Sequence, residues 1–126
     1  MKNSVFEEKL QERRDLTFAV ESVESKFVLI PPFPREIVID INNRCNHMCY
    51  FCANPKIEKY AALDTDIVYD LMRQGIENGC TDLSFHALGD PFMDKRIVEF
   101  IDKSKKLGFE YVYIDTNGAL VNQEKA

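Results

Sequence analysis

The sequence predicts an α/β fold, with a sheet of parallel strands and helices packed on its outside. Three short apolar segments rich in β-branched or aromatic residues alternate with two longer segments of helical periodicity. Each short segment runs directly into a polar loop that carries Gly, Cys or Asn. Repeated strand–loop–helix units imply parallel strands, because the chain returns to the start of the sheet through an outer helix.

The first strand is predicted over residues 36–41, EIVIDI, after the proline-rich stretch 31–35, PPFPR, has interrupted any regular structure. Before that stretch, residues 5–16 show a short, weak helical pattern, and residues 27–30 fit a strand or a loop. We therefore assign residues 1–35 to an N-terminal extension and residues 36–126 to the α/β region.

The first helix is predicted to start with Asp64 or Thr65 as its N-cap and to end at Asn78 and Gly79. Its inward residues are expected to be Ile67, Val68, Leu71, Met72 and Ile76. A second helix is predicted over residues 95–107, with apolar residues that include Val98 and with Gly108 as its stop.

The remaining strands are predicted over residues 83–86 and 111–115, followed by the loops ALGDP and TNGALV. Loops that follow parallel strands meet at one end of the sheet, so we expect the three loops to form one site. A third helix is expected to begin within VNQEKA, residues 121–126. We expect the chain to be the first part of a longer protein; the alternative is a self-sufficient domain whose open sheet edge is covered by a partner.

The composition is that of a globular chain, with 45% hydrophobic and 29% charged residues and a net charge of -5. Lys and Arg are scattered, so no nucleic-acid binding is expected. No apolar run is long enough for a membrane span, and the charged first ten residues do not resemble a signal peptide. The four cysteines then indicate a reducing compartment, the cytoplasm.

Three cysteines lie close together in RCNHMCYFC, at Cys45, Cys49 and Cys52. Thiolates are soft ligands that suit iron–sulfur clusters and zinc. A [4Fe–4S] cluster normally takes four cysteines, so three would leave one iron open for a small molecule. The alternative is a structural zinc site that borrows a ligand such as His47. Cys80 precedes the second strand, at the opposite end of the sheet, and is expected in the core.

The motif Cys-x3-Cys-x2-Cys, with Phe51 just before the last cysteine, resembles that of the radical S-adenosylmethionine (radical SAM) enzymes. HALGDP resembles that family's Gly-Glu-Pro loop, and TNGAL resembles its Thr-Asn-Gly turn. The resemblance covers residues 36–121. Its wording is closest to members with a C-terminal auxiliary-cluster region of the SPASM or twitch type.

The resemblance implies the N-terminal part of a partial (β/α)6 TIM-type barrel, a [4Fe–4S] cluster and S-adenosylmethionine. It also implies reductive cleavage of S-adenosylmethionine to a 5′-deoxyadenosyl radical, which abstracts hydrogen from an unidentified substrate. An electron donor of flavodoxin or ferredoxin type is the implied partner. The second hypothesis is a non-catalytic binding module held by an iron–sulfur cluster or zinc.

The resemblance also implies roles for single residues. Cys45, Cys49 and Cys52 match the metal ligands, and Phe51 matches an aromatic against the adenine. The cofactor-lining loops correspond to Gly89, Asp90 and Pro91 and to Thr116, Asn117 and Gly118. Two positions depart from the family pattern, Asp90 for Glu and Leu88 for Gly, and backbone contacts are expected to survive both changes.

Three polar residues at strand ends, Asp40, His86 and Asp115, are either substrate contacts or hydrogen-bonded residues of the pocket wall. Tyr50 is expected to pack against its neighbours.

Overall fold

A computed structural model describes residues 33–122 of the chain. The expectations for residues 5–16 and 27–30 lie outside this part. The strands are β1 (Glu36–Val38), β2 (Asp82–Phe85) and β3 (Tyr111–Ile114). The helices are α2 (Thr65–Glu77) and α3 (Ile97–Leu107), with single 3-10 turns η2 (Asn54–Lys56) and η3 (Pro91–Met93).

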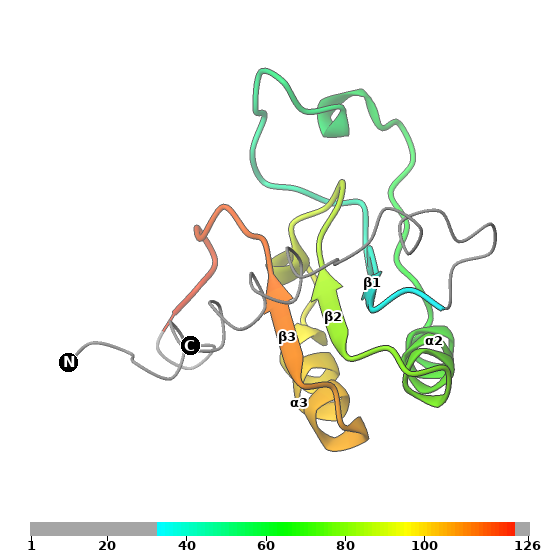
Figure 1. The fold of residues 1–126 in the computed structure, drawn as a ribbon. Helices are drawn as coiled ribbons and strands as arrows, with labels where there is room; N and C mark the ends of the chain where they lie inside the picture. The colour runs from blue at the N-terminus through cyan, green and yellow to red at the C-terminus, as the bar shows by residue number, and fades with distance from the viewer. Residues whose placement is uncertain (1–32, 123–126) are drawn as a thin grey trace, which may run out of the picture. The chain divides into compact units, whose positions relative to one another are not determined.

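The three strands form one parallel sheet in the order β1-β2-β3 (Figure 1). Val38 is the register partner of Ser84, which in turn partners Tyr113. The pairing extends one residue past β1, because the amide of Ile39 donates to the carbonyl of Ser84 over 2.9 Å. The predicted α/β class and parallel strands are confirmed, although β1 is shorter than the predicted segment 36–41.

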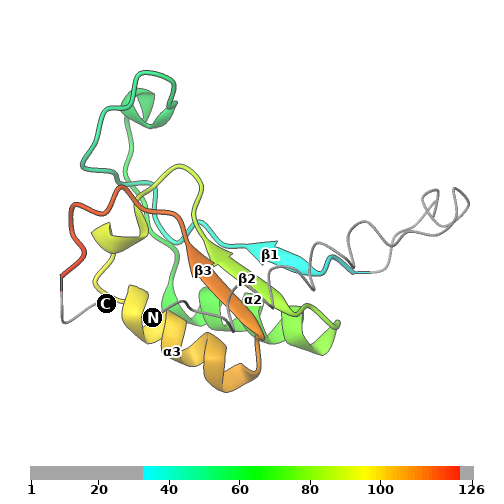
Figure 2. The same ribbon diagram turned by 60° about the vertical axis from the view of Figure 1, so that its left-hand side comes forward.

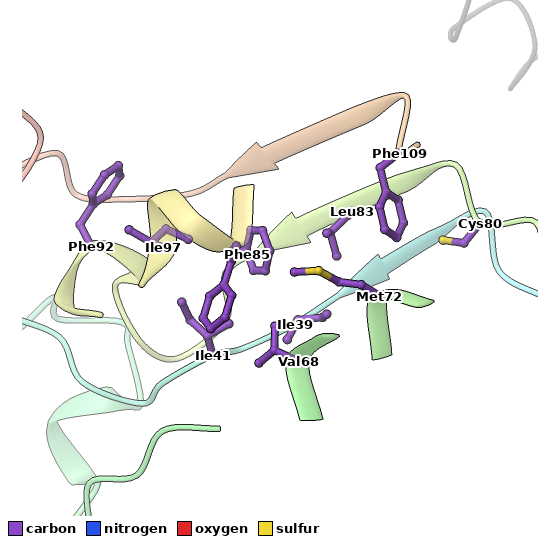
Figure 3. Packing of buried hydrophobic residues seen from close by; sticks show 11 residues of the cluster. Ile39, Ile41, Val68, Met72, Cys80, Leu83, Phe85, Phe92, Ile97 and Phe109 are labelled. Atoms are coloured by element: carbon purple, nitrogen blue, oxygen red, sulfur yellow. The ribbon is translucent and has the colours of Figure 1, made fainter. Parts of the chain in front are cut away.

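Both helices lie on the same face of the sheet (Figure 2). Alternate strand residues point toward them, because successive side chains of a strand lie on opposite faces. The buried core lies between the two layers, as Figure 3 shows. It is built from Ile39, Ile41, Leu83 and Phe85 of the sheet side and Val68, Met72, Ile97 and Phe100 of the helices.

The buried stripe of α2 differs from the predicted one. Val68, Met72 and Gly75 are buried, at the spacing of four and three residues that keeps one helix face turned inward. Ile67 and Leu71 were predicted to point inward, but their exposed fractions are 48% and 40%. Each precedes a stripe residue by one position, which rotates it by about 100° away from the sheet.

The helix ends follow the predicted signals in part. Asp64 is the N-cap of α2, but its side chain makes no capping hydrogen bond. Gly108 ends α3 in the left-handed conformation with φ 105°, which a residue with a Cβ adopts at a cost. Helix α3 begins at Ile97, two residues later than predicted, and the apolar residue Val98 is exposed. Residues 115–122 contain no helix, and most of the segment expected to begin a third helix lies outside the described part.

Arg96 joins the starts of the two helices. Its guanidinium donates to Asp94 through two nitrogens, at 3.0 and 2.7 Å, to the carbonyl of Leu63 at 3.0 Å and to the hydroxyl of Thr65 at 2.9 Å. It also lies over the ring of Phe100, 5.1 Å from the centroid. A fork of planar donors makes this arrangement possible, and a lysine ammonium does not reproduce it.

We therefore expect Arg96→Lys to lower the free energy of unfolding by about 1–3 kcal/mol, because the buried carboxylate of Asp94 and the half-buried acceptors on Leu63 and Thr65 lose donors. Urea unfolding followed by circular dichroism measures this. The control is Arg73→Lys, on the exposed side of α2 where Arg73 pairs with Asp70, with an expected change within about 0.5 kcal/mol. Equal losses in the two variants would contradict the role assigned to Arg96.

The stabilisation of the fold by Arg96 should also depend on pH. The hydrogen bond from Arg96 lowers the pKa of Asp94 below its usual value. A carboxylate with a lowered folded-state pKa stabilises the fold above its unfolded pKa, and that stabilisation is lost as the pH falls through the folded value. The difference in the free energy of unfolding between wild type and Arg96→Lys is therefore expected to become smaller below about pH 4.

Candidate functional site

The loops that follow the three strands meet at the carboxyl end of the sheet, above the arrowheads in Figure 1. Hydrogen bonds connect the loop after β1 to the loop after β2, and the loop after β3 to both of the others. This is the convergence that the parallel topology predicts.

The loop that carries the cysteines is closed at its base. Asn42 and Ala62 form an isolated antiparallel bridge. The side chain of Asn43 spans the same base, since its amide donates to the carbonyl of Lys59 over 3.0 Å and its oxygen accepts from the amide of Ala61 over 2.8 Å. The segment between Asn43 and Lys59, which carries the cysteines, therefore leaves the sheet and returns to it at a fixed point.

Two buried asparagines that the sequence analysis missed join the first two loops. Asn42 donates to the carbonyl of Asp90 over 3.2 Å. Asn54 donates to the carbonyls of Asn43, over 2.8 Å, and of Leu88, over 2.7 Å. An amide that is only 5% exposed requires such partners, because burying it unpaired is costly. The Asn-Pro pair at the start of η2 is the only sequence signal for Asn54, and it indicates a turn rather than a contact.

Gly89 lies at the closest approach of the first two loops. A Cβ at this position would be 1.9 Å from the carbonyl oxygen of Asn42. The next amide, that of Asp90, donates to the carbonyl of Arg44 over 2.7 Å. The φ angle of Gly89 is not positive, so backbone conformation does not require a glycine here. The close approach of the Asn42 carbonyl does, because it leaves no space for a Cβ.

The carboxylate of Asp90 joins the second loop to the third. It is 4% exposed, and one of its oxygens accepts from the amide of Phe92 over 2.9 Å. The other accepts from the hydroxyl of Thr116, over 2.8 Å, and from the amide of Asn117, over 2.9 Å. The side chain thus contacts the protein, and the backbone groups of Asp90 are also hydrogen-bonded, to Arg44 and Asn42. A cofactor contact of Asp90 stays a prediction.

The three cysteines lie along the first loop, with Cys45 and Cys52 half-buried and Cys49 exposed. The amide of His47 donates to the sulfur of Cys45, and the amide of Asn54 donates to that of Cys52, each over 3.4 Å. Such N–H donors stabilise thiolates, the form in which cysteine binds metal. Within residues 33–122, no three His, Cys, Asp or Glu side chains are gathered closely enough to hold a metal ion. The donor chemistry of this loop nevertheless fits an iron–sulfur cluster.

Two aromatic side chains beside the cysteines point into solvent. Phe51 is 92% exposed, and Tyr50 is fully exposed. The expectation that Tyr50 packs against its neighbours is therefore wrong for this structure. Phe51 presents a free ring next to Cys52, and its contact with an adenine stays a prediction.

The sheet face opposite the helices carries polar side chains. Asp40, His86 and Asp115 follow the last register pairs of their strands and so continue as one row across the sheet. Asp40 accepts from the amide of Leu88 over 3.1 Å. The Nδ1 atom of His86 is buried without a hydrogen bond, 3.7 Å from a carboxylate oxygen of Asp115. The row has the exposed carboxylate and the imidazole needed to contact a polar ligand.

Below this row, the carboxylate of Glu36 accepts hydrogen bonds from the hydroxyls of Ser84 and Tyr113. The hydrogen bond to Glu36, followed by burial, raises the pKa of Tyr113 above its usual value, since both disfavour the phenolate. The ring of Tyr113 stacks on that of His86, with centroids 5.9 Å apart. Glu36, Ser84 and Tyr113 thus form a hydrogen-bonded cluster that contacts His86 of the row.

Cys80 is buried, as predicted, and lies at the end of the sheet away from the loops (Figure 3). Its sulfur contacts the carbonyls of Arg35 and Asp82, at 3.0 and 3.2 Å. Burial raises the pKa of the Cys80 thiol, which disfavours the thiolate. Cys80 is therefore a core residue, as expected.

A family model described as the radical SAM superfamily matches residues 39–126. The chain belongs to the radical SAM superfamily. It is also 29% identical over 98 residues to the PqqA peptide cyclase of Gluconobacter oxydans (strain 621H), across 76% of this chain and 27% of that protein. Membership in this family implies a [4Fe–4S] cluster and S-adenosylmethionine as cofactors.

Two solved structures share the fold. BtrN in complex with AdoMet and 2-DOIA aligns with a TM-score of 0.63 at 23% identity, over 72% of this chain and 39% of BtrN. Selenomethionine BtrN in an open conformation aligns with a TM-score of 0.62 at 23% identity, over 72% of this chain and 42% of that one. The α/β fold is therefore consistent with a partial TIM-type barrel, and the chain spans less than half the length of each relative. Among the described helices, none has the length and apolar character needed to cross a bilayer.

The close approach at Gly89 gives a testable prediction. Gly89→Ala should lower the free energy of unfolding by about 3 kcal/mol, the upper end of the cost of overpacking, because backbone atoms would have to move. Gly79→Ala is the control, since Gly79 has φ 86° but no atom within 4 Å of an added Cβ. Its expected cost is about 1 kcal/mol, from backbone conformation alone. Urea unfolding of both variants measures the difference, and equal costs would refute the steric argument.

Proposed function

We propose that Cys45, Cys49 and Cys52 bind a [4Fe–4S] cluster whose fourth iron binds S-adenosylmethionine. The protein would then reductively cleave S-adenosylmethionine and abstract hydrogen from a substrate. One observation carries this proposal. The Cys-x3-Cys-x2-Cys loop is hydrogen-bonded to a Gly-Asp-Pro loop and a Thr-Asn-Gly turn at the carboxyl end of one parallel sheet.

The bound cofactors would supply the electron transfer and the carbon–sulfur cleavage. The chain's own residues would hold and orient them. The three thiolates would anchor the cluster, and the backbone around Gly89 and Asn117 would contact the S-adenosylmethionine. The ring of Phe51, which is exposed, is free to lie against the adenine. The carboxylate of Asp90 would act on the cofactors indirectly, because it fixes the turn that contains Asn117.

The substrate would approach the row formed by Asp40, His86 and Asp115. These residues lie at the same end of the sheet as the three loops, on the sheet face opposite α2 and α3. The names of the two relatives mention different molecules. One relative is a cyclase of the peptide PqqA, and the other is bound to 2-DOIA. A substrate therefore does not transfer from them to this chain. An electron donor of flavodoxin or ferredoxin type is the proposed partner, and a cytoplasmic location follows from the need for reduced thiols.

The metal assignment is tested by single cysteine substitutions. Replacing Cys45, Cys49 or Cys52 with Ala should abolish the cluster that forms on anaerobic iron–sulfur reconstitution, because each thiolate holds one iron. Cys80→Ala is the control and should retain it. Iron and sulfide content and the visible spectrum are the measurements. A cluster retained in Cys52→Ala but lost in Cys80→Ala would overturn the assignment, and a colourless protein with one zinc per chain would favour the non-catalytic module.

The role of Phe51 is tested by affinity. Phe51→Ala should raise the dissociation constant for S-adenosylmethionine by about tenfold, because stacking of a base on an aromatic ring contributes about 1–3 kcal/mol. Tyr50→Ala is the matched control, an equally exposed neighbouring ring, and should change the constant by less than about twofold. Anaerobic equilibrium dialysis with the reconstituted protein gives both constants. A larger effect at Tyr50 than at Phe51 would show that the wrong ring has been assigned.

A further inference from the structure

The side-chain amide of Asn117 has a fixed orientation. Its oxygen accepts from the amide of Ala119 over 2.9 Å, so its nitrogen must face the other way. That nitrogen donates to the side-chain oxygen of Asn46 over 2.7 Å and lies 3.8 Å from the sulfur of Cys45. An amide nitrogen carries two hydrogens, which suffices for both contacts.

The backbone of Asn117 is held as firmly as its side chain. The buried carboxylate of Asp90 accepts from the amide of Asn117 and from the hydroxyl of Thr116. The same hydroxyl accepts from the amide of Gly118 over 3.1 Å. The turn after β3 is thus fixed from the second loop while its asparagine reaches to the first.

We propose that Asn117 is a redox-tuning residue, whose amide donates a hydrogen bond to the sulfur of Cys45 and raises the reduction potential of the cluster. Asp90 is the positioning residue that holds Asn117 there. This inference rests on the proposed function, because it concerns the cluster that Cys45 would bind. Reduction adds negative charge to a cluster and its thiolates, and an N–H group directed at a sulfur stabilises that charge.

Among the described donors to the cysteine sulfurs, Asn117 is the one that substitution can remove. His47 and Asn54 donate to Cys45 and Cys52 through backbone amides, which every residue except proline retains. The contribution of Asn117 is therefore separable from that of the loop backbone.

The test is an anaerobic redox titration of the reconstituted chain, followed by the electron paramagnetic resonance signal of the reduced cluster. Asn117→Ala removes the donor and should shift the potential to a more negative value. Asn117→Asp places a carboxylate beside the sulfur and should shift it further in the same direction. Asn46→Ala removes the neighbouring acceptor but keeps the amide, which Ala119 still orients, and should leave the potential near that of wild type.

The positioning role of Asp90 is tested in the same titration. Asp90→Asn loosens the turn, which lowers the potential, and it also removes a carboxylate charge, which raises the potential. In the Asn117→Ala background only the charge effect remains, so the shift caused by Asp90→Asn should be more negative in the wild-type background than in the Asn117→Ala background. Equal shifts in the two backgrounds would show that Asp90 does not act through Asn117.

The outcomes separate this inference from the proposed function. A wild-type chain that takes up no iron–sulfur cluster would refute both. A full cluster with an unchanged potential in Asn117→Ala would refute the tuning role alone. Equal shifts in Asn46→Ala and Asn117→Ala, or loss of the cluster in Asn117→Ala, would also refute it, because the amide would then serve loop packing or assembly.

Discussion

The site depends above all on the buried carboxylate of Asp90. Its acceptor positions are used by Phe92, Thr116 and Asn117, while its backbone pairs with Arg44 and Asn42 of the first loop. Nothing in a three-stranded sheet alone would hold loops of such different length in contact. One short acidic side chain does so because burial makes each of its hydrogen bonds costly to break.

Different residues therefore fix the loops and face the proposed cofactors. The sheet and the helices position only the points where the loops leave, while Gly89, Asn42 and Asn54 set the distance between the first two loops. The cysteines and Phe51 remain at the exposed edge of this framework. Contacts within the protein thus fix this framework, whereas Cys49 and Phe51 stay exposed to solvent.

The layout of the site could be predicted from sequence, but its internal contacts could not. Parallel topology follows from the order of apolar segments, and it places the three loops together without knowledge of any distance. The steric need for Gly89 depends on where the carbonyl of Asn42 falls, which no local pattern encodes. Asp90 matched a cofactor-binding position of the family, yet its side chain has a structural role that only the fold reveals. Ile67 and Leu71 fitted a helical period equally well, but the rotation of α2 against the sheet decides which stripe is buried.

The spacing of these contacts along the chain bears on how the protein matures during synthesis. Asn42 and Asp90 are 48 positions apart, and Asp90 and Asn117 a further 27. All three cysteines leave the ribosome long before the turn that contains Asn117 exists. Contacts between distant segments also form late in folding, because loop closure must precede them. Iron delivered to the nascent chain at that stage would therefore meet the three thiols without the amide of Asn117 beside Cys45.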